Sequence, residues 1–277
     1  MISLKPDPEV NVRKVQIRTR NGYFPALILS PKERKVNVPG ILWIHGGGYI
    51  LGMKEMVHMS RAVNLVKKYG AVVLSPGYRL AFQTPYPAAI EDCYDALLYL
   101  HQNADALGIN PRQIMTGGES AGGGLCAALC IMARDLGGPG IAFQMPLYPM
   151  IDNFDTDSSL NNHGRIWNTK RNHFGWKMYL REHAEEEVSP FAAASRCRNY
   201  AGLPPAYTFV SDGEPFYSET LAYIENLKKC GIPAEVDVYH GNVHAFDMIC
   251  PDNEQSKIAV KKFEEHFEYA VNHYFSR

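Results

Sequence analysis

The stretch that decides the fold runs from residue 116 to residue 123 and reads Thr-Gly-Gly-Glu-Ser-Ala-Gly-Gly. Residues 118–122 match the pattern Gly-x-Ser-x-Gly and directly follow the apolar run 114–116. The pattern is typical of a nucleophile elbow, a tight strand-to-helix turn whose glycines let the backbone bend around a serine. Alone it is weak evidence, because average glycine usage produces it by chance in roughly one chain in ten of this length. Its meaning depends on the surrounding sequence.

Apolar runs and amphipathic segments alternate on both sides of this stretch. Apolar strands are predicted at 40–44 and 71–74, with the amphipathic segment 57–68 between them. This order of strand, helix and strand is typical of a parallel βαβ unit. The other predicted elements are a hairpin of strands 12–19 and 23–29 joined at Asn21-Gly22, strands at 113–116, 141–148, 206–211 and 235–239, and helices at 87–101, 121–135, 218–230 and 254–274. We therefore predict one α/β domain over 1–277, a mostly parallel, doubly wound sheet of about eight strands with an insertion at approximately 152–190.

Composition limits the classes of partner. The chain has 277 residues, 46% of them hydrophobic, and a formal charge of −1. A balanced charge gives no basic stripe for nucleic acid and no polybasic membrane anchor, so a neutral small molecule is the expected partner. The N-terminal residues do not resemble a signal peptide, and no stretch approaches the length of a membrane span. The six cysteines show no zinc-site spacing, which favours reduced thiols and a cytoplasmic protein.

A nucleophilic serine requires a base, and the base requires an orienting acid. The loop after the predicted strand 206–211 offers two acids, Asp212 and Glu214, and the loop after strand 235–239 offers His240 and His244. The glycines of His45-Gly46-Gly47-Gly48, directly after another strand, let bare backbone approach a substrate oxyanion. All parts of a serine-hydrolase site are therefore present at predicted strand ends.

At this point the chain resembles the hormone-sensitive-lipase-like carboxylesterases (bacterial family IV type) of the α/β-hydrolase superfamily, over roughly residues 38–275. The matching motifs, in chain order, are His45-Gly-Gly-Gly-Tyr49, Tyr78-Arg79-Leu80, Pro85-Tyr-Pro-Ala-Ala89 with Glu91-Asp92, Gly118-Glu-Ser-Ala-Gly-Gly123, Leu203-Pro-Pro-Ala206, Glu214-Pro-Phe216 with Glu219, and His244-Ala-Phe246. Several independent motifs in the same order make this likeness far more specific than the serine pentapeptide alone.

The resemblance implies a serine hydrolase that cleaves carboxylic esters of short acyl chains, acetyl to roughly hexanoyl, without a metal or organic cofactor. By that likeness Ser120 is the nucleophile and His244 the base, with Gly47, Gly48 and Ala121 as oxyanion donors. The acid departs from the family pattern Asp-Pro-Leu: the matching position is Glu214, and Asp212 stays the alternative. His240 is the weaker candidate for the base.

Neighbouring residues are assigned supporting or pocket roles. His45 is expected to hold the oxyanion loop, and Glu119 to orient loops around the elbow. The insertion is expected to form a helical cap whose aromatic residues either line a substrate pocket or attach the cap to the sheet. Four aromatic residues are candidates for the pocket: Tyr49, Trp167, Trp176 and Phe216. The short segment before the first strand predicts a shortened N-terminal cap and a more open lid.

Other functions remain open at the level of sequence. The same machinery can deacetylate sugars or cleave an activated amide, as arylformamidases do, and fold analogy does not separate these reactions. A non-catalytic small-molecule receptor on the same scaffold is a more distant alternative. A homodimer is possible through the last strand and helix at the sheet edge.

Overall fold

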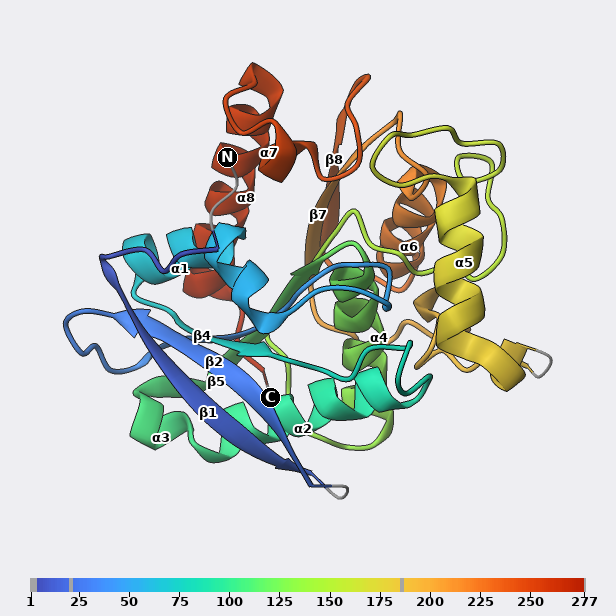
Figure 1. Ribbon diagram of the computed structural model, residues 1–277. Helices are drawn as coiled ribbons and strands as arrows, with labels where there is room; N and C mark the ends of the chain where they lie inside the picture. Colours follow the sequence, from blue (N-terminus) through green and yellow to red (C-terminus); the bar gives the residue numbers. More distant parts are fainter. Residues whose placement is uncertain (1–3, 20–21, 185–186, 277) are drawn as a thin grey trace.

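A single twisted sheet forms the centre of the computed structural model, which describes residues 4–19, 22–184 and 187–276 (Figure 1). Its strands are β1 (Val10–Thr19), β2 (Gly22–Pro31), β3 (Val38–Ile44), β4 (Val72–Pro76), β5 (Ile109–Glu119), β6 (Gln144–Leu147), β7 (Ala206–Ser211) and β8 (Ala234–Tyr239). They lie in the order β1-β2-β4-β3-β5-β6-β7-β8. β2 pairs antiparallel with β1 and with β4, whereas every pair from β4 to β8 is parallel. The predicted eight-stranded, mostly parallel α/β sheet is confirmed.

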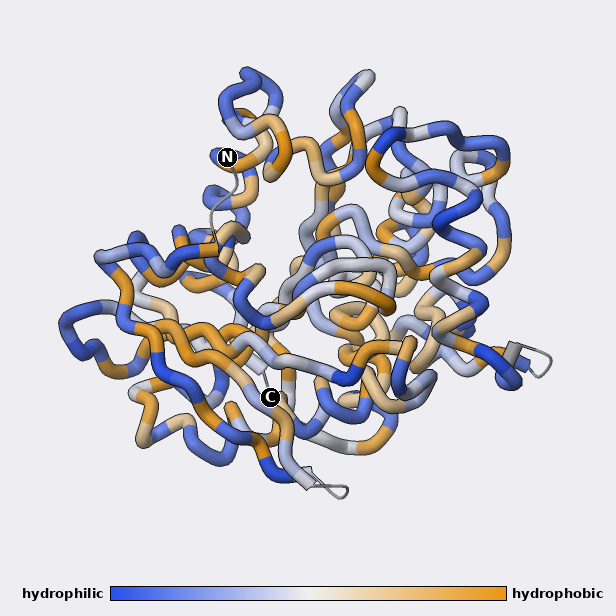
Figure 2. Tube along the Cα trace, viewed as in Figure 1, coloured by the Kyte–Doolittle hydropathy of each residue, from blue (hydrophilic) through white to orange (hydrophobic). Residues whose placement is uncertain are grey.

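Helices cover both faces of the sheet. The α-helices are α1 (Ala62–Tyr69), α2 (Ala88–Gln102), α3 (Ala104–Leu107), α4 (Ala121–Asp135), α5 (Thr169–Leu180), α6 (Tyr217–Lys229), α7 (Phe246–Ile249) and α8 (Glu254–His273), with 3-10 turns η1 (Lys54–Met59), η2 (Arg181–Ala184) and η3 (Ala194–Arg196). α1 and α8 pack in one hydrophobic core, and α2 and α4 pack in another on the opposite face. Figure 2 shows the apolar residues concentrated in the strands and the inner sides of these helices. The sheet is thus buried on both faces, as parallel sheets require.

The strand connections reverse direction between β3 and β5. These two strands are neighbours, but the chain leaves β3 toward β4 on one side and leaves β5 toward β6 on the other. In open α/β sheets, ligands bind at the carboxyl ends of the strands where such a reversal occurs. The loop of residues 45–52 follows β3, and Ser120 follows β5, so both predicted catalytic elements lie at this reversal.

Several elements differ from their predicted bounds, and two of these differences have a local reason. β5 extends to Glu119, because Gly117 and Gly118 pair with Trp43 and Ile44 of β3, although glycine weakens a strand by propensity. The amphipathic segment 57–68 divides into η1 and α1, because the Ser60 hydroxyl accepts a hydrogen bond from the Ala62 N–H and starts a new helix. In the predicted hairpin, Asn21 lies outside the described residues.

The predicted cap insertion is mostly irregular, and its described residues contain one long helix, α5. Asn168 caps α5 by accepting a hydrogen bond from the Arg171 N–H, and the buried side of α5 carries Trp176 and Tyr179. In the view of Figure 1, α5 is drawn at the right, on the outside of the molecule. Across the described residues, no helix is both long enough and apolar enough to cross a membrane.

Candidate active site

Ser120 lies on a strained turn between β5 and α4. Its backbone has φ 56° and ψ −121°, a conformation that a residue with a side chain rarely adopts. A Cβ on Gly118 would lie 2.4 Å from the carbonyl oxygen of Ile44, and one on Gly122 would lie 2.1 Å from the same atom. The two glycines of the pentapeptide are therefore required by the close approach of β3, as expected for a nucleophile elbow.

The imidazole of His244 lies between Ser120 and Glu214. Its Nε2 atom is 2.9 Å from Ser120 Oγ, and its Nδ1 atom forms a short hydrogen bond with Glu214 Oε2. The other carboxylate oxygen of Glu214 accepts a hydrogen bond from the Ser211 N–H at 3.1 Å. Burial raises the pKa of Glu214, while the imidazole and this N–H oppose the rise. All three side chains are buried and form one hydrogen-bonded series.

Asp212 and His240, the alternative acid and base, pair with each other on the surface. Asp212 accepts hydrogen bonds from His240 Nδ1 at 2.7 Å and from the Gly241 N–H at 2.8 Å. Both residues are exposed. Of the two acids, the structure brings Glu214 to His244.

The glycine loop after β3 packs directly on the elbow. A Cβ on Gly46 would lie 3.2 Å from Ser120 Cβ, and Gly47 and Gly48 have φ values of 122° and 61°, which only glycine adopts readily. Gly47 accepts hydrogen bonds from the N–H groups of Ile50 and Leu51, which close the loop. Within the described residues, the N–H groups of Gly47 and Gly48 donate to no backbone carbonyl.

Comparison with known proteins agrees with this arrangement. A family model described as alpha/beta hydrolase fold matches residues 41–248. The chain belongs to the α/β-hydrolase fold family. It is 31% identical over 265 residues to the carboxylesterase NlhH of Mycobacterium tuberculosis, covering 90% of this chain and 81% of that protein. A solved structure of a bacterial heroin esterase superposes with a TM-score of 0.91 at 30% identity, covering 98% of this chain and 86% of the other.

A longer relative is the AB hydrolase superfamily protein C1039.03 of Schizosaccharomyces pombe, which is 33% identical over 216 residues. That alignment covers 74% of this chain but only 62% of the relative. The esterases among these relatives place the chain in the hormone-sensitive-lipase-like group, so this α/β hydrolase is a carboxylic ester hydrolase.

His45 and Glu119, the two predicted supporting residues of this hydrolase, are both buried. His45 Nδ1 is 2.8 Å from the Gly46 carbonyl oxygen, and its ring stacks on Tyr78 at 4.2 Å. Burial lowers the pKa of His45 to about 4, so the ring is neutral at pH 7. Glu119 accepts a hydrogen bond from the indole N–H of Trp43. Burial is the main cause that raises the pKa of Glu119 to about 8, and the charge of Asp247 is the second. Among the described residues, the side chain that is hydrogen-bonded to Ser120 Oγ is His244.

The four aromatic pocket candidates occupy different places. Tyr49 stacks on Tyr179 at 4.1 Å and lies 5.2 Å from Trp176, and both Tyr49 and Trp176 are buried in the core. Phe216 is buried with its ring edge-on to His244, at 5.0 Å. Trp167 is half-buried, and its indole ring occupies the space that a Cβ on Gly48 would fill. Trp167 therefore packs the predicted cap insertion against the glycine loop after β3.

Three residues near His244 were not singled out by the sequence. Tyr148 follows β6, Asp247 lies in the short helix α7, and Arg61 precedes α1. Tyr148 packs edge-on against the imidazole at 5.2 Å and donates a hydrogen bond to Asp247. The position of Asp247 three residues after His244 was the one available signal, because nothing in the sequence connects Arg61 or Tyr148 to this site.

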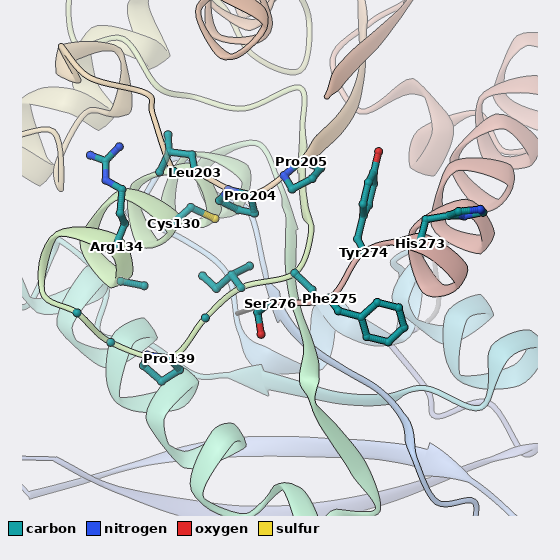
Figure 3. Close-up of a pocket in the computed structure, with 17 residues that line it drawn as sticks. Cys130, Arg134, Pro139, Leu203, Pro204, Pro205, His273, Tyr274, Phe275 and Ser276 are labelled. Carbon is teal, nitrogen blue, oxygen red and sulfur yellow. The ribbon is translucent and has the colours of Figure 1, made fainter. Parts of the chain in front are cut away.

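A separate pocket of about 670 Å³ lies at the opposite edge of the sheet (Figure 3). It is formed by the loop after α4, the segment before β7 and residues 273–276. Figure 3 shows Leu203 and Pro204 on one side of it and Tyr274 on the other. Because Pro205 precedes the first residue of the parallel strand β7, this pocket is distant from Ser120 at the end of β5.

Proposed function

We propose that this protein hydrolyses carboxylic esters of short acyl chains through Ser120, His244 and Glu214, with an acyl-enzyme intermediate. The proposal rests on one observation. Hydrogen bonds link Ser120 Oγ to the His244 ring and that ring to Glu214, and all three side chains are buried at a strained elbow. This is the arrangement of nucleophile, base and orienting acid that acyl transfer requires.

In the proposed reaction, Ser120 Oγ attacks the ester carbonyl carbon while His244 Nε2 accepts the hydroxyl proton. The tetrahedral intermediate carries a negative charge on the former carbonyl oxygen, which the N–H groups of Gly47, Gly48 and Ala121 stabilise. His244 then donates the proton to the leaving alcohol, and the acyl group remains on Ser120. In the second half, His244 takes a proton from water, which attacks the acyl-enzyme and releases the acid.

Glu214 has two roles in this scheme. It accepts a hydrogen bond from His244 Nδ1, which leaves the lone pair of Nε2 directed at Ser120. Its charge stabilises the imidazolium that forms when the proton moves. The Ser211 N–H donates a hydrogen bond to the second carboxylate oxygen of Glu214. This bond fixes the position of the carboxylate, although glutamate has one methylene more than the aspartate of the family pattern.

The contact between Trp167 and Gly48 supports a short acyl group. An indole ring against the oxyanion glycine forms a wall beside the proposed carbonyl position, and this wall leaves less room for a long chain on that side. We therefore propose that acetyl to roughly hexanoyl esters are preferred.

Hydrolysis of p-nitrophenyl acetate, butyrate and octanoate tests this function, with Ser120→Ala as the blank. Acetylated xylose and N-formylkynurenine in the same panel test sugar deacetylation and amide cleavage. We expect serine-dependent turnover of the acetate and butyrate esters that exceeds turnover of the octanoate ester. Turnover that persists in Ser120→Ala would contradict the assignment of the nucleophile, and a preference for octanoate would contradict the short acyl range.

A further inference from the structure

A buried ion pair lies directly behind the proposed base. Asp247 is fully buried, its Oδ1 accepts a hydrogen bond from the Tyr148 hydroxyl at 2.9 Å, and its Oδ2 lies 3.4 Å from Arg61 Nε. Among the described residues, neither Oδ2 nor Arg61 Nε forms a hydrogen bond, so the two groups interact through their charges. Apolar residues of similar volume often stabilise a core at least as well as a buried ion pair. Stability alone therefore gives no reason for this pair.

Tyr148 connects Asp247 to the imidazole. The Tyr148 ring is perpendicular to the His244 ring, with an interplanar angle of 81° and a centroid distance of 5.2 Å, and Phe216 makes the same kind of contact at 82° and 5.0 Å. Two aromatic rings thus hold the plane of the imidazole. The hydroxyl of one of them is fixed by Asp247, so a displacement of Asp247 would be transmitted to His244.

The same cluster extends to Glu119, the residue before the nucleophile Ser120. The Arg61 cation favours the ionised form of Glu119, and the Asp247 carboxylate disfavours it. The charged and titratable groups that face Asp247 come from four other segments: Arg61 before α1, Glu119 at the end of β5, Tyr148 after β6, and Glu214 after β7. His244 faces it from the loop before α7. Asp247 is therefore in contact or in electrostatic interaction with every part of the proposed catalytic series except Ser120 itself.

We propose that Asp247 is a positioning residue for His244: through Tyr148 it fixes the imidazole plane, and through its ion pair with Arg61 it joins the base loop to the segment before α1. The inference rests on the proposed function, in which His244 is the base. When His244 accepts the serine proton, Asp247 adds a second carboxylate to the field that stabilises the imidazolium, beside Glu214. A negative charge near His244 would thus be the reason why the Arg61–Asp247 ion pair is buried here.

Asp247→Asn tests the inference, because asparagine keeps an acceptor for Tyr148 but removes the charge. We expect kcat on p-nitrophenyl acetate to fall about tenfold, the size of one charged interaction lost in the transition state, with KM unchanged. The acid limb of the pH profile of kcat/KM should move to lower pH, because the anion that favours the protonated imidazole is gone. Each measurement is repeated in a Glu119→Gln background, where Glu119 cannot ionise to replace the lost charge.

Asp237→Asn is the matched control. Asp237 on β8 also accepts a hydrogen bond from a tyrosine, Tyr207, at 2.8 Å, and it lies outside the cluster around His244. We expect kcat and the acid limb to stay as in the unmodified protein. The double variant Asp247→Asn/Arg61→Gln removes both charges, so it remains informative if the single variant does not fold, and its acid limb should lie between those of Asp247→Asn and the unmodified protein.

Labelling of Ser120 with a fluorophosphonate separates the two proposals. If the unmodified protein is not labelled at Ser120 and Ser120→Ala keeps turnover, the proposed function itself is wrong. If labelling and serine-dependent turnover are present but Asp247→Asn and the double variant keep kcat and the acid limb, only the role of Asp247 is refuted. A loss of kcat in both variants with an unmoved acid limb would also refute it, since a purely structural role predicts that result.

Discussion

His244 Nε2 lies 2.9 Å from Ser120 Oγ, although 124 positions separate the two residues in the chain. Ser120 follows β5 and His244 follows β8, and the parallel pairing of the strands from β5 to β8 brings both strand ends to one edge of the sheet. Glu214 arrives at the same edge after β7. The series is therefore assembled by sheet topology, with each member on a separate loop.

Replacement of the acid should separate Glu214 from Asp212. Glu214→Gln keeps the size of the side chain but favours the wrong tautomer of His244, so we expect kcat on p-nitrophenyl butyrate to fall by about 10³ to 10⁴. Asp212→Asn is the control, because Asp212 pairs with His240 on the surface and should leave kcat close to that of the unmodified protein. A large loss in Asp212→Asn with a small loss in Glu214→Gln would reverse the assignment.

The contact between Gly48 and Trp167 predicts that activity is sensitive to substitutions in the proposed oxyanion loop. A Cβ at Gly48 would lie 2.1 Å from the Trp167 ring, so Gly48→Ala must displace the loop or the cap. We expect kcat to fall on the order of 10²-fold, as for the loss of one oxyanion donor. Trp167→Ala in the same chain removes the clash but not the cost of φ 61°, and should restore part of the activity.

Gly231→Ala is the matched control for Gly48→Ala. Gly231 has φ 73° at the end of α6, and no heavy atom lies within 4 Å of a Cβ built there. This variant carries the backbone cost alone, about 1 kcal/mol of unfolding free energy, and should leave kcat unchanged. Equal loss of kcat in both alanine variants would show that the Trp167 contact is not the cause.

Glu119 should make the protein less stable as the pH rises. In the folded protein the pKa of Glu119 is about 8, against 4.5 ordinarily, because burial and Asp247 disfavour its charge. Between these two values the folded state holds a proton that the unfolded state has lost. The free energy of unfolding therefore falls as the pH rises through this window, by up to about 1.4 kcal/mol per pH unit. Below pH 4.5 this contribution is fully present.

Glu119→Gln should remove that part of the pH dependence. The measurement is urea unfolding at intervals from pH 5 to pH 9, with Glu225→Gln as a surface control. Glu225 is exposed and its pKa is lowered by Lys229, so it is ionised throughout the window in both states. If the Glu119→Gln and Glu225→Gln profiles coincide, the shifted carboxyl is not Glu119.

The ion pair of Arg79 with Asp92 should contribute to stability without affecting chemistry. Asp92 is buried and accepts hydrogen bonds from the Arg79 backbone N–H and guanidinium, at distances from 2.8 to 3.1 Å. Asp92→Ala leaves the half-buried guanidinium without this partner, so we expect a loss of about 3 kcal/mol in urea unfolding. Glu91→Ala, whose carboxylate lies 3.7 Å from the same guanidinium at the surface, should cost less than about 1 kcal/mol. Equal losses would contradict the role assigned to burial.

Local pattern was sufficient for the architecture and for the chemical groups. The alternation of apolar runs and amphipathic segments predicted the parallel sheet, because burial on both faces requires continuous apolar strands. The elbow glycines and the glycine loop were identifiable, since their backbone conformations and close contacts exclude other residues. The predicted strand bounds were wrong where tertiary contacts override the low strand propensity of glycine. Gly117 and Gly118 are extended because they pair with β3.

Contacts between distant segments were decided only by the tertiary structure. The residues alone left Asp212 and Glu214 as alternative acids, and only the family resemblance favoured Glu214, because the folded loop decides which carboxylate reaches the base. The fold directs Glu214 to His244 and Asp212 to His240. Similarly, Arg61 and Asp247 are far apart in the chain, and no local signal joins them. The sequence by itself determined which groups reach the edge of the sheet, whereas packing in three dimensions decided which of them meet.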